Sequence, residues 1–296
     1  MMLNTKNISC LMLLSCLITI AGCAGGGGSS SSTSTSGFSA WSAVTPNSAI
    51  SLSGSSTSVT GLGSGSTSSY GASGNFTFDN GRNFTAVSMT SGTGAGATFN
   101  ANAGDQFYQG IGNGTIFAVN KQGVGAVITN PYDAAFEYQT FGAWGAYAGG
   151  PQPSNANAVS LGSATSVTGM PSTGSVTFNG FSAGLYYQGA AGYFTAANMS
   201  AGVDFAARTI AFNTTNTVVT GAVTGAASIP SSSLNMTGYG TYSSGTSRFS
   251  GSLTTANGMI GTMTGQFYGP NANEIGGTYY ATGSQGYTVG GFGGKR

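Results

Sequence analysis

The chain has 296 residues, of which 40% are hydrophobic, 11% aromatic and only 4% charged. This hydrophobic fraction is too high for a disordered polar chain and indicates a folded protein. Seven basic against six acidic residues leave no basic patch to neutralise a run of phosphates, which excludes nucleic acid as a partner. The chain has no histidine, which excludes imidazole-based catalytic triads, the common zinc sites and a proximal histidine on haem.

The first 22 residues have the layout of a secretory signal peptide. One basic residue, Lys6, precedes an apolar run over residues 8–20, and two small residues follow. The run is too short for a membrane-spanning helix, so we expect residues 1–22 to be removed as a signal peptide. The positions Ile20-Ala21-Gly22-Cys23 resemble the lipobox of bacterial lipoproteins. The resemblance implies cleavage before Cys23, a diacylglycerol on its thiol and a further acyl chain, such as palmitate, on the freed amine; the alternative is an ordinary signal peptide with a chance cysteine.

Residues 23–36 are predicted to be the lipid anchor and a Gly/Ser linker. As a flexible coil this linker has an r.m.s. span of roughly 20 Å, which holds a folded domain just clear of the headgroups. Ala24 stands where an aspartate would signal retention in an inner membrane, so lipoprotein sorting favours the outer membrane. All three cysteines lie in the first 23 positions. An acylated mature chain would therefore keep no thiol for a disulfide, a metal site or a nucleophile.

From residue 37 onward, short runs rich in Val, Thr, Phe and Tyr alternate with turn signals, which predicts an all-β fold. The clearest predicted strands are residues 74–81, 115–120, 175–180, 208–212, 248–253 and 276–280. Asn-Gly pairs, which supply the positive φ angles of tight hairpins, occur at 80–81, 113–114, 179–180 and 257–258.

A Gly/Pro/Asn-rich stretch at residues 148–157 is typical of a linker or long loop and divides the chain into two parts. Residues 37–150 are predicted to form a β-rich subdomain of less regular pattern. The sequence leaves open whether this subdomain contains a short helix near residues 133–137. Residues 151–296 have the short strands and glycine-rich turns of a closed antiparallel barrel or a sandwich.

The second part contains a motif that resembles a known family. Residues 265–280, GQFYGPNANEIGGTYY, closely resemble the C-terminal barrel motif of transferrin-binding protein B and its relatives. Weaker likenesses follow in the family's order at residues 141–144, 170–180, 203–205 and 292–296. The resemblance implies a handle-like subdomain over residues 37–150 and an eight-stranded antiparallel β-barrel over residues 151–296. It also implies a single-lobe, transferrin-binding-protein-like solute-binding protein, in a group that includes surface lipoproteins and haem carriers exported with an outer-membrane assembly protein.

The motif is interpreted as fold-determining rather than ligand-binding. We expect its turn to use the fixed φ of proline and the freedom of glycine, Glu274 to accept hydrogen bonds from backbone amides, and two glycines to let the strand bend into the barrel. The residues concerned are Gly269, Pro270, Asn271, Glu274, Gly276 and Gly277.

The resulting functional hypothesis is a lipid-anchored protein of the outer membrane, exposed at the cell surface, which binds an iron source for nutrient acquisition. Its partners would be the membrane, an export or assembly protein, and either an iron-carrier protein or haem. Without histidine, haem would need tyrosine, methionine or apolar contacts; the tyrosines singled out are Tyr108, Tyr132, Tyr138, Tyr147, Tyr186 and Tyr187. The alternatives are an adhesin or host-factor-binding lipoprotein with no small ligand, and a structural or assembly role.

An enzyme is the least favoured reading of the sequence. The six acidic residues are scattered, and the pair Asp133 and Glu137 is better explained as a solvated face than as a catalytic pair. We therefore expect no catalytic residue, no resident cofactor and no metal site. The sequence does not identify which loops would contact a partner.

Overall fold

The computed structural model of the protein describes residues 38–296 except 111, 113, 147–154, 190 and 222–225. The predicted signal peptide, the lipid-attachment site Cys23 and the linker lie outside the described residues. Those that are described build an all-β protein, as the sequence predicts, whose helices are only three-residue 3-10 turns. These turns are η1 Trp41–Ala43, η2 Gly61–Gly63, η3 Ala101–Ala103, η4 Val167–Gly169 and η5 Ser232–Leu234. Within the described ranges, no helix has the length and apolar character needed to cross a bilayer.

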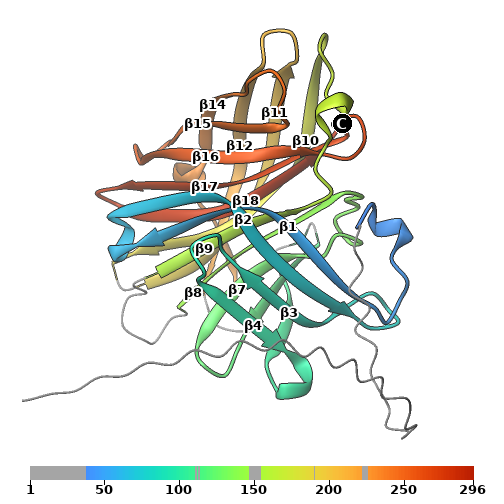
Figure 1. Cartoon of the computed structure of the whole chain (residues 1–296). Helices are drawn as coiled ribbons and strands as arrows, with labels where there is room; N and C mark the ends of the chain where they lie inside the picture. The colour runs from blue at the N-terminus through green and yellow to red at the C-terminus, as the bar shows by residue number, and fades with distance from the viewer. Residues whose placement is uncertain (1–37, 111, 113, 147–154, 190, 222–225) are drawn as a thin grey trace, which may run out of the picture. The chain divides into compact units, whose positions relative to one another are not determined.

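The first nine strands form one antiparallel sheet, coloured blue to yellow-green in Figure 1. Its order is β4-β3-β2-β1-β9-β8-β7-β6-β5. The strands are β1 Ala49–Thr60, β2 Gly65–Phe78, β3 Phe84–Thr90, β4 Gly96–Asn100, β5 Gln106–Gln109, β6 Thr115–Val119, β7 Val124–Thr129, β8 Gln139–Ala146 and β9 Asn155–Gly162. One face buries a core that includes Trp41, Phe76, Phe99 and Trp144. Near residues 133–137 the chain forms no helix: residues 131–135 are consecutive turns, and residue 137 is a bend.

The remaining strands form a closed barrel, because β10 pairs with both β11 and β18 and the ring returns through β12, β14, β15, β16 and β17. The pairing of β11 with β12 completes the ring, so the eight-stranded antiparallel barrel is confirmed. The short strand β13 is additional and pairs with the end of β12. The strands are β10 Ser175–Gln188, β11 Ala191–Asp204, β12 Thr209–Gly221, β13 Ser228–Pro230, β14 Met236–Thr241, β15 Arg248–Thr255, β16 Ile260–Tyr268, β17 Glu274–Gly283 and β18 Gly286–Lys295.

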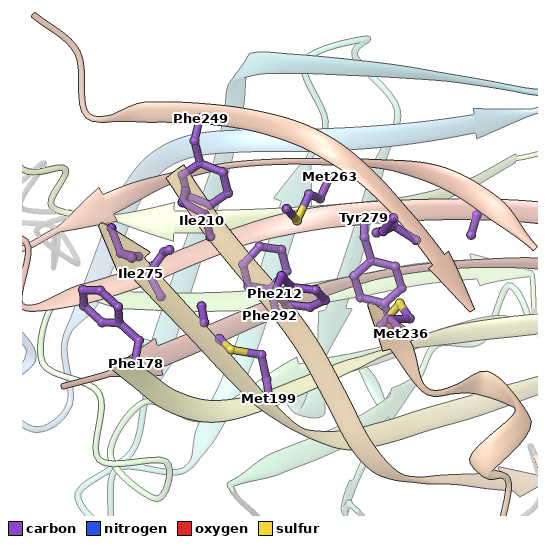
Figure 2. Packing of buried hydrophobic residues seen from close by; sticks show 14 of the residues in the cluster. Phe178, Met199, Ile210, Phe212, Met236, Phe249, Met263, Ile275, Tyr279 and Phe292 are labelled. Carbon is purple, nitrogen blue, oxygen red and sulfur yellow. The ribbon is translucent and has the colours of Figure 1, made fainter. Parts of the chain in front are cut away.

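The interior of the barrel is filled by side chains. Alternating residues of its strands point inward, as the buried and exposed positions along β12 and β15 show. Figure 2 shows aromatic rings and methionines from different strands packed against one another, among them Phe212, Phe292 and Met263. The barrel therefore has a packed core rather than an open lumen.

The boundary between the two parts lies later than the sequence places it. The predicted division after residue 150 falls among residues 147–154, outside the described ranges. Residues 155–162, which the sequence places in the barrel half, form β9 and pair with β1 and β8 of the first sheet. Pairing on both sides keeps this segment in the sheet, so the barrel proper begins at Ser175, the first residue of β10.

The Asn-Gly pairs differ in their roles. Asn257-Gly258 makes the β15–β16 turn, with φ +85° at Gly258, as predicted. Asn80-Gly81 lies between β2 and β3, but there the positive φ belongs to Arg82. Asn179-Gly180 is not a turn: it lies inside β10, where ladder partners on both β11 and β18 hold the backbone extended. The fourth pair includes residue 113, which is not described.

The first sheet and the barrel share a third hydrophobic cluster. Side chains from the first sheet, such as Phe141 of β8, pack there against barrel residues such as Phe181 and Val289. A hydrogen bond of 2.8 Å also joins the hydroxyls of Thr57 in β1 and Thr278 in β17, both buried and 221 positions apart in the chain. The two parts are therefore joined by a shared interior and not by the connecting chain alone.

Candidate functional site

The motif at residues 265–280 lies at the junction of the barrel with the first sheet. It comprises the end of β16, a turn and the start of β17. Glu274, the first residue of β17, is only 3% exposed. Its Oε1 accepts a hydrogen bond of 2.6 Å from the backbone N–H of Glu137, and its Oε2 accepts one of 3.2 Å from that of Tyr138. These are backbone amides, the type of donor expected from the sequence, and they belong to the chain leading into β8.

Removal of the Glu274 carboxyl from water makes its charged form unfavourable. Burial, with a smaller contribution from the nearby charge of Glu137, raises the pKa of Glu274 from 4.5 to about 7. The hydrogen bonds from the backbone of Glu137 and Tyr138 and from the Gln139 side chain act in the opposite direction and lower the pKa. Because burial has the larger effect on the pKa, this carboxyl changes its protonation state near neutral pH.

Gly276 has a different role from the bend that the sequence suggests. A Cβ atom at this position would lie 1.9 Å from Oε1 of Gln139 and 3.0 Å from Oγ of Ser160, both in the first sheet. Gln139 is fully buried, and its Nε2 donates a 2.9 Å hydrogen bond to the carbonyl of Ile275 in β17. Gly276 therefore leaves the space into which the Gln139 side chain reaches to bind the barrel backbone.

Gly277, the next residue, contacts the barrel itself, because its Cβ would lie 2.3 Å from the backbone oxygen of Thr264 on β16 and 2.7 Å from Cζ of Phe292 in the barrel core. Gly291 on β18 faces the first sheet, as Gly276 does, because a Cβ there would lie 2.8 Å from the Phe141 ring. Glycines of β17 and β18 thus allow the side chains of β8 to rest directly on the barrel wall.

The turn of the motif holds the segment that connects the two parts. Gly269 has φ +81°, and a Cβ there would lie 2.6 Å from the ring of Tyr138, so glycine is required on two counts. Its N–H donates to the carbonyl of Ser163 at 2.9 Å, and its carbonyl accepts from Oγ1 of Thr165 at 2.7 Å.

The next two residues of the turn make contacts of their own. Pro270 lies close to η4, where a Cβ on Gly169 would lie 2.2 Å from the Pro270 oxygen. Asn271 donates its backbone N–H to Oδ1 of Asn273 at 3.2 Å.

The five described tyrosines among the candidate haem ligands do not meet in one place. The Tyr187 hydroxyl donates to the carbonyl of Ala146, and that of Tyr186 donates to the carbonyl of Gln285. The ring of Tyr132 packs in the core of the first sheet, and Tyr138 lies against the motif turn. Tyr108 donates to Gln106 in β5, and Tyr147 lies outside the described residues. Burial raises the pKa of Tyr187 well above its usual range, which disfavours the phenolate that a haem iron would bind.

One cavity in the barrel interior has room for about a single water molecule. This cavity of about 10 Å³ is lined by Ser182, Thr195, Ala196, Ala197, Thr217, Leu234, Met236, Tyr279 and Thr288. A cavity of this size holds about one water molecule, whereas small-molecule sites are usually about 300–1,000 Å³. Among the described residues, no three acidic, cysteine or histidine side chains gather as a metal would require.

Comparison with known structures gives several partial likenesses. Transferrin-binding protein B from Haemophilus parasuis, as a single-site variant, is 14% identical with a TM-score of 0.44 over 77% of this chain and 54% of that one. The same protein from Neisseria meningitidis is 17% identical with a TM-score of 0.40 over 78% and 53% of the two chains. The N-lobe of lactoferrin-binding protein B from Moraxella bovis is 13% identical with a TM-score of 0.37 over 66% and 80%. The present chain thus spans about half the length of the first two proteins.

The sequence comparisons agree with the position of the barrel. Curated protein sequences give no match to the chain. Residues 170–296 match the family described as the C-lobe and N-lobe beta barrels of Tf-binding protein B. The matched range includes all eight strands of the closed ring, from β10 to β18, and the whole of the motif. Residues 170–296 therefore form a β-barrel of the kind found in the lobes of transferrin-binding protein B.

Proposed function

We propose that this chain is a surface lipoprotein of the outer membrane that binds an iron-carrier protein for nutrient acquisition. The observation that carries the proposal is the match of residues 170–296 to the barrels of a transferrin-binding protein. A protein ligand is favoured over haem because the barrel core is filled and the candidate tyrosines are dispersed.

Binding of an iron carrier is tested with the full acylated chain in detergent. We expect immobilised chain to bind iron-loaded transferrin or iron-loaded lactoferrin, measured by biolayer interferometry, and a hemin titration to leave the Soret band unshifted. Serum albumin serves as the control protein. Absence of binding to both carriers would refute the proposal and favour the adhesin or host-factor alternative, and a Soret shift would favour haem.

The lipid anchor is a separate proposal that rests on the lipobox resemblance at Cys23. We expect Cys23→Ser to leave unprocessed precursor and to abolish incorporation of labelled palmitate, because the diacylglyceryl group is attached to the cysteine sulfur and the amine is freed for acylation only by cleavage. The measurement is metabolic labelling followed by electrophoresis, with Cys16→Ser as the matched control that should be processed and labelled normally. Normal processing of Cys23→Ser with the label retained would contradict the anchor. If the anchor is present, export of the chain to the cell surface would also require the proposed outer-membrane assembly protein.

We also propose that the motif acts in folding and not in ligand contact. Its contacts support this role. Glu274 accepts hydrogen bonds from the backbone amides before β8, and Gly276 leaves space for the side chain of Gln139. The turn at Gly269 is hydrogen-bonded to the segment that connects the two parts. These residues would fasten the first sheet to the barrel, which leaves the loops and the outer wall for partners.

A further inference from the structure

A shallow groove crosses the outer wall of the barrel on β10, β11, β12 and β14. Its volume is about 410 Å³. Four residues form a continuous cross-strand row through it, because Thr177 pairs with Gly202, Gly202 with Ala211, and Ala211 with Tyr239. The small side chains in the middle of the row form the floor, and the larger Tyr239 and Thr177 stand on either side.

The floor of the groove is open backbone. A Cβ atom at Gly202 would meet no heavy atom within 4 Å, and the φ of Gly202 is not in the positive range. This glycine is therefore not explained by the close approaches that explain Gly276 or Gly277. Tyr239, at one side of the groove, is 55% exposed, so a large part of its aromatic ring is accessible to a ligand.

The other lining residues are two valines, Val176 and Val203, and hydrogen-bonding residues that are nearly uncharged. Ser175, Thr177 and Thr209 present hydroxyls, which both donate and accept. Asp204 is the one charged lining residue. Its Oδ1 accepts from the backbone amides of Ala206 and Ala207, both at 2.9 Å, which fixes the carboxylate at the end of the groove.

We propose that this groove binds a neutral sugar unit of a glycan, with one face of a pyranose ring on Tyr239. A pyranose has an apolar C–H face that suits an aromatic ring, and a rim of hydroxyls that suits Ser, Thr and a carboxylate acceptor. The volume lies in the range of small-molecule sites, roughly 300–1,000 Å³. An anionic ligand is disfavoured by Asp204 and the absence of a lining cation, and a protein partner by the lack of an arginine beside the single aromatic residue. This site is independent of the proposed iron-carrier binding.

The structure supplies a variant that fills the groove without disturbing the barrel. Because the space above Gly202 is empty, Gly202→Leu should fold normally and occupy the floor. Tyr239→Ala removes the exposed ring. Ile260→Ala is the matched control, since Ile260 is 66% exposed on β16 and does not line the groove. Circular dichroism melts check that each variant is folded.

The test is saturation-transfer difference NMR on the full chain in detergent with maltohexaose, cellohexaose and triacetylchitotriose. We expect saturation transfer to the C–H protons of at least one sugar, with a fall of about tenfold in affinity for Gly202→Leu and Tyr239→Ala, the loss of roughly 1.4 kcal/mol, and no change for Ile260→Ala. Absence of transfer to all three sugars, or equal transfer to Gly202→Leu, would overturn the proposal. It would also be overturned if the chain formed a dimer by sedimentation that Tyr239→Ala dissociated, because the groove would then be a self-association surface.

Discussion

Replacing Gly276 with valine is expected to lower the free energy of unfolding by about 3 kcal/mol, since it both overpacks a buried site and displaces a hydrogen-bonded amide. The added Cβ would lie 1.9 Å from Oε1 of Gln139, and the two methyl groups need still more room. Gln139 cannot move without losing its bond to the carbonyl of Ile275. The measurement is urea unfolding of Gly276→Val beside the unmodified chain.

Two further variants make this expectation specific to the contact. Gly202→Val introduces the same side chain into a strand of the same barrel where the space is open, and should change stability by less than about 1 kcal/mol. Gln139→Ala should relieve part of the effect of Gly276→Val, with a coupling of at least about 1 kcal/mol in the double-mutant cycle. Additive effects would show that the two residues do not compete for this space.

The stability of the chain is expected to fall by about 2.5 kcal/mol between pH 5 and pH 8 because of Glu274 alone. Its pKa is 4.5 when exposed and about 7 in the folded protein. Between these values the folded chain holds a proton that the unfolded chain has released, so stability decreases as pH rises. The stabilisation is complete below pH 4.5 and is lost as pH passes 7. Urea unfolding at half-unit steps of pH measures the slope.

The side chain that usually titrates in this window is histidine. The chain has no histidine, and the hydrogen bonds of Asp79 with Asn83 lower the pKa of Asp79, away from the window. Glu274→Gln should therefore make stability nearly flat from pH 5 to pH 8, whereas Asp133→Asn, at an exposed acid, should keep the slope of the unmodified chain. A slope that persists in Glu274→Gln would mean that another group is responsible.

Local patterns in the sequence identified the strands and the barrel well, because alternation and turn residues act over a few positions. The turn at Asn257-Gly258 is an example. Asn179-Gly180 has the same local signature, yet pairing with β11 and β18 makes it the interior of a strand. The assignment of β9 failed for a similar reason, since its partners β1 and β8 decide its place.

The sequence singled out Glu274 and Gly276 but could not name the atoms that surround them. The donors to Glu274 lie 136 and 137 positions away, just before β8. The side chain that needs Gly276 to be small is that of Gln139, the first residue of β8. The groove at Tyr239 was missed altogether, since its residues come from four strands and meet only through their register. A glycine in a strand with no neighbour to explain it, such as Gly202, becomes informative only after the fold is known.

The bond between Thr57 and Thr278 has a consequence for how quickly the native state can be reached. Its partners are 221 positions apart, and the ring of the barrel closes only when β18 pairs with β10. Contacts of such long separation must pay their loop-closure entropy before they are rewarded, which makes folding slow. The first sheet also packs on β17 and β18, so neither half has all of its partners until the last strand is available. We therefore expect a chain that lacks its last strand not to reach the native packing of either half.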